Sequence, residues 1–142
     1  MTLAEILAYK GSTVHTISPD ATVADAVRTL VAKHIGSLVV CDRDGRVVGI
    51  ITERDILRCV SRQTDLEATR VSERMSSYVV TVSPFDSLEL AMGVMTERRI
   101  RHLPVIADGH MVGMISIGDL VKAEHETLLL ENRLMTDYIR AY

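Results

Sequence analysis

Two stretches of this chain, GIITERD at residues 49–55 and GMISIGD at residues 113–119, follow one pattern. Each runs glycine, two apolar residues, a hydroxyl residue, two variable positions and aspartate. A Ser or Thr followed three residues later by an acidic residue is a capping-box pattern, so each stretch predicts a strand that ends in a capped helix. The same residue types are also suited to holding a sugar and its phosphate. The two interpretations are compatible, because Thr52 can cap the helix while the Asp55 carboxylate faces a cleft.

These stretches close two copies of one longer unit. VHTISPDATVADAV at residues 14–27 aligns with VVTVSPFDSLELAM at residues 79–92. HIGSLVVCDRDGRVVGIITERDIL at residues 34–57 aligns with RIRHLPVIADGHMVGMISIGDLV at residues 99–121. The second copy is one residue shorter, and the missing residue falls in the turn before its Asp-Gly pair. An indel confined to a turn is expected of a duplicated fold.

Each copy predicts the element order β-α-β-β-α. Short strands are expected at residues 15–17 and 80–82, where Ser-Pro ends them because proline cannot continue a ladder. Thr22 and Ser87 are the expected N-caps of the helices that follow. The β-branched runs on both sides of Asp-Gly predict a hairpin, and the hydroxyl residue of each motif then opens the last helix.

The expected fold class is α+β, with two units packed sheet against sheet in pseudo-twofold symmetry, because one unit is too small to be stable alone. Residues 1–142 then form a single domain. Its parts are a first repeat at 10–62, a polar linker at 63–76, a second repeat at 77–124 and a C-terminal helix at 125–142. Leu3 to Leu7 predict a short additional helix.

The last helix is expected to be long. From Ile117 it can continue to about Ile139, since no Pro or Gly follows Gly118 to stop it. Its apolar residues recur every seven positions at Val121, Leu128, Met135 and Tyr142, with Leu134 and Tyr138 one turn apart nearby. Such a seam usually packs on another helix, and a homodimer is its simplest use.

Composition excludes several function classes. The net charge of −3 gives no basic footprint for nucleic acid. No apolar run is long enough to span a bilayer and no signal-peptide pattern opens the chain, so we expect a cytoplasmic protein without membrane contact. Cys41 and Cys59 lack metal-ligand spacing and are expected as buried core residues rather than a redox switch. No catalytic motif is present, so we expect no enzyme activity and no metal.

The doubled β-α-β-β-α unit with its repeated Gly-apolar-apolar-Thr/Ser-x-x-Asp motif resembles the tandem cystathionine-β-synthase (CBS) domain pair. The resemblance covers about Val14 to Val121, and the chain closely resembles small stand-alone CBS-pair proteins. It implies a regulatory module that binds an adenosine-containing ligand (AMP, ADP, ATP, NAD(H) or S-adenosylmethionine) in the cleft between the repeats. It also implies dimers, and signalling to a partner protein through conformational or dimer-packing change.

The resemblance further implies a role for particular residues. Asp55 and Asp119 would accept hydrogen bonds from ribose hydroxyls, which suits a carboxylate because its two oxygens match a vicinal diol. The phosphate would meet helix N-termini and polar or basic side chains, here Thr52, Arg54, Ser116, Arg101 and His102. Adenine would lie along the first strand of each repeat, at His15, Thr16, Ile17, Val80, Thr81 and Val82.

Several alternatives remain open at this point. The first repeat has Gly36 and Ser37 where the second has Arg101 and His102, so the two sites are expected to differ. The basic run at residues 97–102 is equally typical of a solvated helix end. The motif glycines suit either close backbone approach or packing. The main alternative function is a purely structural dimer that uses the long C-terminal helix as its interaction surface.

Overall fold

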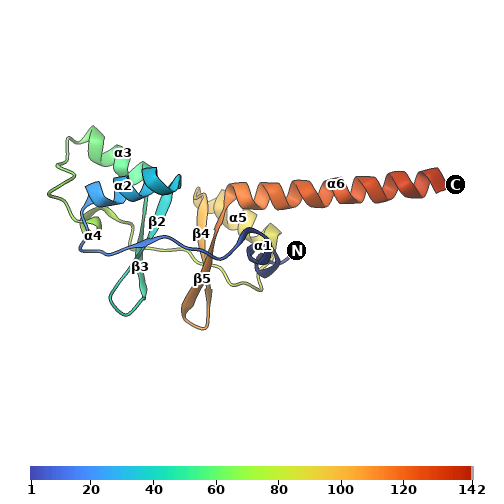
Figure 1. The fold of residues 1–142 in the computed structure, drawn as a ribbon, viewed down its shortest axis with the longest axis horizontal. Helices are drawn as coiled ribbons and strands as arrows, with labels where there is room; N and C mark the ends of the chain where they lie inside the picture. Colours follow the sequence, from blue (N-terminus) through green and yellow to red (C-terminus); the bar gives the residue numbers. More distant parts are fainter. Residues whose placement is uncertain (142) are drawn as a thin grey trace.

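The computed structural model describes residues 1–141 and contains the doubled unit (Figure 1). In the first repeat, β1 (Thr16–Ile17) is followed by α2 (Val23–Lys33), β2 (Ser37–Cys41), β3 (Val47–Thr52) and α3 (Glu53–Ser61). The three strands form one sheet in the order β1-β2-β3, with β1 parallel to β2 and β2 antiparallel to β3. The predicted β-α-β-β-α order is therefore confirmed.

The second repeat has the same order with a shorter first strand. It contains α5 (Leu88–Arg98), β4 (His102–Ala107), β5 (His110–Ser116) and the start of α6 (Ile117–Ala141). The strand expected at residues 80–82 is reduced to one parallel bridge between Val82 and Val105. Two backbone hydrogen bonds form the bridge, from Val82 N to Pro104 O (3.0 Å) and from Ile106 N to Val82 O (2.8 Å).

Local capping explains why the helices begin and end where they do. Thr22 caps α2 and Ser87 caps α5, as predicted, each accepting a hydrogen bond from the backbone N–H three residues on. Both helices end at a residue in the left-handed conformation, His34 with φ 54° and Arg99 with φ 55°. The matching caps show that the duplication extends to helix ends.

The segment before each repeat packs on the other repeat. The helix α1 (Leu3–Lys10) joins the second repeat, where Leu88 N donates to Met1 O (3.0 Å). The short helix α4 (Val71–Arg74) joins the first repeat, where Val71 N donates to Ala21 O (2.8 Å). The polar linker expected at residues 63–76 thus contains a helix whose Val71 is fully buried.

The buried apolar residues form two clusters, one in each repeat. One contains Leu38, Ile51 and Val71, and the other contains Leu103 and Ile115 together with the α1 leucines. The helix α1, which precedes the first repeat, therefore completes the core of the second. The helix α4, which precedes the second repeat, completes the core of the first. Burial of whole Leu and Ile side chains contributes about 1.5–3 kcal/mol each, so the crossings stabilise the arrangement of the two repeats.

The motif glycines lie where the crossing segments touch the hairpins. A Cβ added at Gly49 would meet the Met75 side chain and the Ser76 carbonyl oxygen, at 2.9 Å from the latter. A Cβ added at Gly113 would meet the Leu7 side chain, with its Cδ2 atom at 2.6 Å. Packing by α1 and by the end of α4, rather than approach of a ligand, accounts for both glycines.

The long helix α6 extends away from the two repeats (Figure 1). Its first turns are anchored by Leu120 and Ala123, which are buried, whereas every described residue from Leu128 onward is exposed. The predicted end near Ile139 is close to the observed end at Ala141. Tyr142, part of the predicted seven-residue repeat, lies outside the described residues. No helix within residues 1–141 has the length and apolar character that crossing a membrane requires.

The two cysteines occupy different environments. Cys59 on α3 is buried, as predicted, and Cys41 at the end of β2 is half-buried. Burial, together with the neighbouring Asp42 carboxylate, raises the pKa of the Cys41 thiol. The thiol of Cys41 therefore stays protonated at neutral pH, which disfavours redox chemistry there.

Candidate functional site

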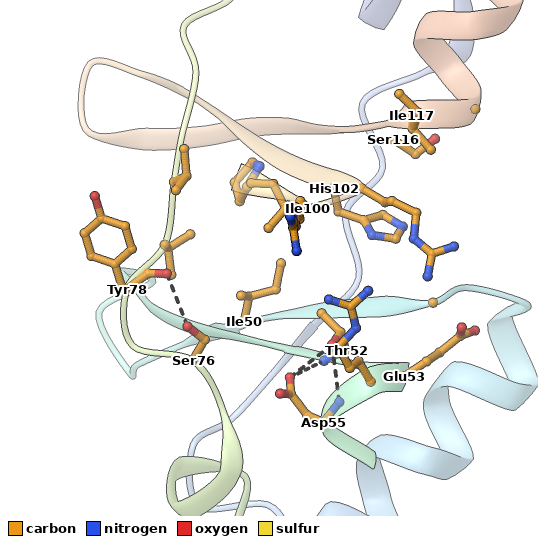
Figure 2. Close-up of a pocket in the computed structure, with 18 residues that line it drawn as sticks. Ile50, Thr52, Glu53, Asp55, Ser76, Tyr78, Ile100, His102, Ser116 and Ile117 are labelled. Atoms are coloured by element: carbon orange, nitrogen blue, oxygen red, sulfur yellow. Dashed lines mark hydrogen bonds between the residues drawn. The ribbon is translucent and has the colours of Figure 1, made fainter. Parts of the chain in front are cut away.

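An open cavity of about 470 Å³ lies between the two repeats (Figure 2). The first repeat lines it at the junction of β3 and α3. The second repeat lines it at the starts of β4 and α6. The segment that crosses from α4 to the second repeat closes a third side. Its volume falls within the range of 300–1,000 Å³ typical of small-molecule sites.

Two helix N-termini line this cavity. Thr52, the N-cap of α3, and Ser116, which precedes α6, both belong to its wall. Figure 2 shows them on opposite sides, with Asp55 beside Thr52. Free N–H groups and the positive end of the dipole at a helix N-terminus favour bound anions, so this pairing suits a phosphate.

Both motifs form reciprocal capping boxes. Thr52 N donates to Asp55 Oδ2 (2.9 Å) and Asp55 N donates to Thr52 Oγ1 (3.4 Å). Ser116 N donates to Asp119 Oδ2 (2.8 Å) and Asp119 N donates to Ser116 Oγ (3.1 Å). The structural interpretation of the motif is therefore correct at both places. It leaves the second carboxylate oxygen, Oδ1, outside the box in each case.

Cationic side chains gather on the wall formed by the second repeat. Arg99 and Arg101 line the cavity there beside His102, and Arg54 faces them from α3. Two carboxylates, those of Glu53 and Asp55, also line the cavity. Burial, and next the Arg101 guanidinium, lower the pKa of His102 despite the opposite effect of Glu53 and Asp119. His102 is therefore neutral at pH 7 and can gain a proton when an anion arrives.

Most of the predicted phosphate and ribose residues meet at this one cavity. The lining includes Thr52, Arg54, Asp55, Val80, Arg101, His102 and Ser116. The remaining predicted residues, Asp119, His15, Thr16, Ile17, Thr81 and Val82, do not line it. The side chains of Ile17 and Val82 pack on the two cores instead. Residues from both repeats thus form one composite site, and their roles toward a ligand stay predictions.

Asp119 has a partner of its own. Its Oδ2 atom lies 2.6 Å from Lys10 Nζ, and Lys10 also donates to the Met114 carbonyl oxygen at 2.8 Å. Burial raises the pKa of Asp119, but the hydrogen bonds from Lys10 and Ser116 outweigh it and lower the pKa overall. The two motif carboxylates are therefore in different environments.

Several lining residues were missed from the sequence. Ser76, Tyr78 and Val79 come from the crossing segment, and Ile50 and Ile100 supply apolar wall. Nothing local marks these positions, because a long-range crossing places them. Two others carried a signal: Glu53 lies between the predicted residues Thr52 and Arg54, and Arg99 belongs to the basic run at residues 97–102.

The site contains no evident metal centre. Within residues 1–141, no three His, Cys, Asp or Glu side chains are grouped so that they could hold a metal ion.

Fold and site together define a tandem-repeat domain with a polar cavity between its two halves. The chain belongs to the CBS domain family, whose model matches residues 10–62 and 71–126. It is similar to a mitochondrial CBS domain-containing protein of Arabidopsis thaliana, with 38% identity over 131 residues and 86% of this chain covered. The chain spans 64% of that protein's length and 66% of another curated relative's, which is less than two thirds.

Solved structures show the same fold. A CBS-domain containing protein from Agrobacterium tumefaciens has 40% identity and a TM-score of 0.83, covering 87% of this chain and 92% of its own. A CBS domain protein from Pyrobaculum aerophilum, solved in complex with AMP, has 30% identity and a TM-score of 0.77. That likeness covers 84% of this chain and 89% of the Pyrobaculum chain.

Proposed function

We propose that this protein is a non-catalytic regulatory module that binds an adenosine-containing nucleotide in the cavity between its repeats. The observation that carries the proposal is the meeting of Asp55, two helix N-termini and a basic wall at one cavity. A regulatory module needs ligand affinity and a second state for that affinity to bias, rather than a catalytic constellation. The AMP complex of the Pyrobaculum relative supports the choice of ligand class.

Asp55 is suited to the ribose. Its Oδ2 atom accepts from Thr52 N and Thr52 Oγ1 (3.1 Å). Its Oδ1 atom lies 3.8 Å from an Arg58 guanidinium nitrogen, which is beyond hydrogen-bond distance. This oxygen therefore keeps acceptor capacity for a sugar hydroxyl, while the capping box holds the carboxylate in place.

The phosphate is assigned to the basic side of the cavity. The lining there includes Ser116 before α6, Arg101 directly before β4, and His102 as the first residue of β4, with Arg54 in the first turn of α3 facing them. Charge-assisted hydrogen bonds from guanidinium groups to phosphate are among the stronger polar contacts in proteins. The proton that His102 can gain adds a further positive charge.

The base is assigned to the apolar wall. Ile50, Val80, Ile100 and Pro104 supply apolar surface, and the extended backbone near Val80 supplies hydrogen-bonding groups. The aromatic ring of Tyr78 lies at the mouth (Figure 2) and is 72% exposed. Adenine is thus expected between the crossing segment and the second repeat.

A thermal-shift series with AMP, ADP, ATP, NAD, NADH and S-adenosylmethionine tests the proposal. A ligand at a hundredfold excess over its dissociation constant adds about 2.7 kcal/mol of stability. For a chain of this size that corresponds to a rise in Tm of roughly 5–10 °C. The absence of a shift with all six, on protein purified free of nucleotide, would refute the proposal.

The role of Asp55 is tested with a matched pair of variants. Asp55→Asn keeps a cap acceptor but removes the carboxylate, and is expected to abolish most of the shift. Asp25→Asn is the control, because Asp25 forms the same capping box with Thr22 (3.0 and 3.1 Å) away from the cavity. Equal ligand responses from the two variants would contradict the assignment.

A homodimer through α6 is the second part of the proposal. Leu128, Leu134 and Met135 are 52%, 60% and 64% exposed on a helix that leaves the body of the molecule. A second copy can cover these residues, and dimer packing can carry the ligand signal to a regulated partner protein. Light scattering behind size exclusion gives the mass directly, and a monomer at micromolar concentration would contradict it. A cytoplasmic location stays a prediction of the sequence.

A further inference from the structure

The last residue of α1 enters the second repeat at its motif carboxylate. Lys10 Nζ donates to Asp119 Oδ2 at 2.6 Å and to the Met114 carbonyl oxygen at 2.8 Å. The side chains of Lys10 and Asp119 are 32% and 22% exposed, so the pair is largely shielded from water. One ammonium group is therefore held by acceptors from two elements, β5 and α6.

The equivalent position of the first repeat, next to Gly49 and Ile50, has different contacts. Leu7 of α1 faces Gly113 as Met75, which follows α4, faces Gly49, so the two crossing segments are equivalent up to this point. The helix α4 ends before Met75, and the next residue, Ser76, exchanges two backbone hydrogen bonds with Ile50 (3.0 and 2.9 Å). After Leu7, α1 continues to Lys10. The Lys10 ammonium donates a hydrogen bond to the carbonyl oxygen of Met114, which is the counterpart of Ile50.

This extra turn of α1 makes the two carboxylates chemically unequal. Both carboxylates keep Oδ1 outside the capping box, but their cationic neighbours differ. The Arg58 guanidinium lies 3.8 Å from Asp55 Oδ1, whereas the Lys10 ammonium is in direct contact with Asp119 Oδ2 at 2.6 Å. A ribose diol that uses both oxygens of Asp119 would have to displace the Lys10 ammonium from Oδ2. The lysine would then lose a charge-assisted hydrogen bond, which is roughly twice as strong as a neutral one.

We propose that Lys10 occupies the ligand position at Asp119 as an internal cation, so that the chain binds one nucleotide, at Asp55, and not two. Lys10 is then the residue that decides stoichiometry. The inference rests on the proposed function, because it concerns the same ligand class at the pseudo-symmetric position. The difference between the two motif carboxylates is then caused by a residue of α1 and not by either motif.

Titration calorimetry with AMP, ATP and NAD, each in turn, tests the inference on the full chain. The wild type is expected to bind one nucleotide and the Lys10→Met variant two, with Lys10→Gln as a second variant of similar length. Lys33→Met is the control, since Lys33 is an exposed lysine at the end of α2. In the Lys10→Met background, Asp55→Asn is expected to leave one site and Asp119→Asn the other.

A second measurement needs no ligand. The carboxyl carbon of Asp119, followed by NMR during an acid titration, is expected to show a higher pKa in Lys10→Met than in the wild type or in Lys33→Met. An unchanged titration would show that the contact is absent in solution and would overturn the inference. So would two bound nucleotides in the wild type, or one in both Lys10 variants, with the proposed function intact. No binding of any of the three nucleotides by either protein would instead overturn the proposed function, and this inference with it.

Discussion

A single methyl group at Gly49 is expected to destabilise the protein more than the same methyl at its counterpart Gly113. The Cβ of Gly49→Ala would collide with the Met75 side chain and approach the Ser76 carbonyl oxygen to 2.9 Å. That oxygen accepts from Ile50 N at 3.0 Å, so it cannot retreat without loosening the bridge that holds the crossing segment.

The expected magnitude follows from three contributions. Overpacking a filled core costs about 1–3 kcal/mol. A weakened backbone hydrogen bond adds up to about 1 kcal/mol. Replacing Gly by Ala restricts the unfolded chain, which offsets about 0.4–1 kcal/mol. The net loss for Gly49→Ala is therefore about 2 kcal/mol.

Gly113→Ala is the matched comparison. The three atoms nearest to its Cβ all belong to the Leu7 side chain, with the two methyl carbons at 2.6 and 2.9 Å, and a side-chain end can shift more easily than a main-chain carbonyl. Because no main-chain atom is among these nearest contacts, the net loss is expected to be about 1 kcal/mol or less. Because Ser76 lines the cavity, Gly49→Ala is also expected to weaken nucleotide binding, and Gly113→Ala is not.

Urea denaturation of the two variants and the wild type measures the free energies of unfolding. Equal midpoints for Gly49→Ala and the wild type would refute the packing argument. A larger loss for Gly113→Ala than for Gly49→Ala would refute the distinction between main-chain and side-chain contact.

Three further predictions concern other parts of the molecule. The pKa of His102 in the folded protein lies below its ordinary value of 6.5, because of burial and then the Arg101 guanidinium. Its contribution to the free energy of unfolding is therefore complete above about pH 6.5 and is lost as the pH falls toward the folded pKa. The free energy of unfolding of His102→Asn is therefore expected to fall less than that of the wild type between about pH 7.5 and 5.5, and a steeper fall would contradict this. Leu3→Ala removes a fully buried α1 side chain and is expected to cost about 2–5 kcal/mol by urea denaturation; a cost under about 1 kcal/mol would show that α1 does not dock. A chain that ends at Thr127 is expected to keep its circular dichroism and melting transition but lose self-association in light scattering, whereas an unchanged mass would remove α6 from the interface.

Much of the fold is predictable because its determinants are local. Helix caps such as Thr22 and Ser87 act within one turn, and the Asp-Gly hairpins act within a few residues. The duplication then doubles each weak signal, since the same pattern predicts the same element twice. A shortfall of the prediction, the strand expected at residues 80–82, depends on pairing with Val105, and pairing between distant segments has no local signature.

The candidate site was predicted only in part for the same reason. Residue type and motif identified Thr52, Asp55 and Ser116, whose capping geometry is local. The grouping of these residues in one cavity, with Tyr78 at its mouth, depends on how the two repeats face each other. The hydroxyl and carboxylate residues can be identified from the sequence, but the fact that they line one cavity together cannot.

The sequence by itself determined the doubled β-α-β-β-α unit, its capped helices and the carboxylate in each motif, because propensity, capping and hydrophobic periodicity act over a few residues. Only the tertiary structure decided that α1 packs on the second repeat and α4 on the first. It also decided that Lys10 contacts Asp119, which lies 109 positions away along the chain. Both follow from burying the apolar face of a short helix wherever complementary surface exists, and that surface is formed by distant parts of the chain. The two motifs are alike in sequence, and long-range packing is what makes them different.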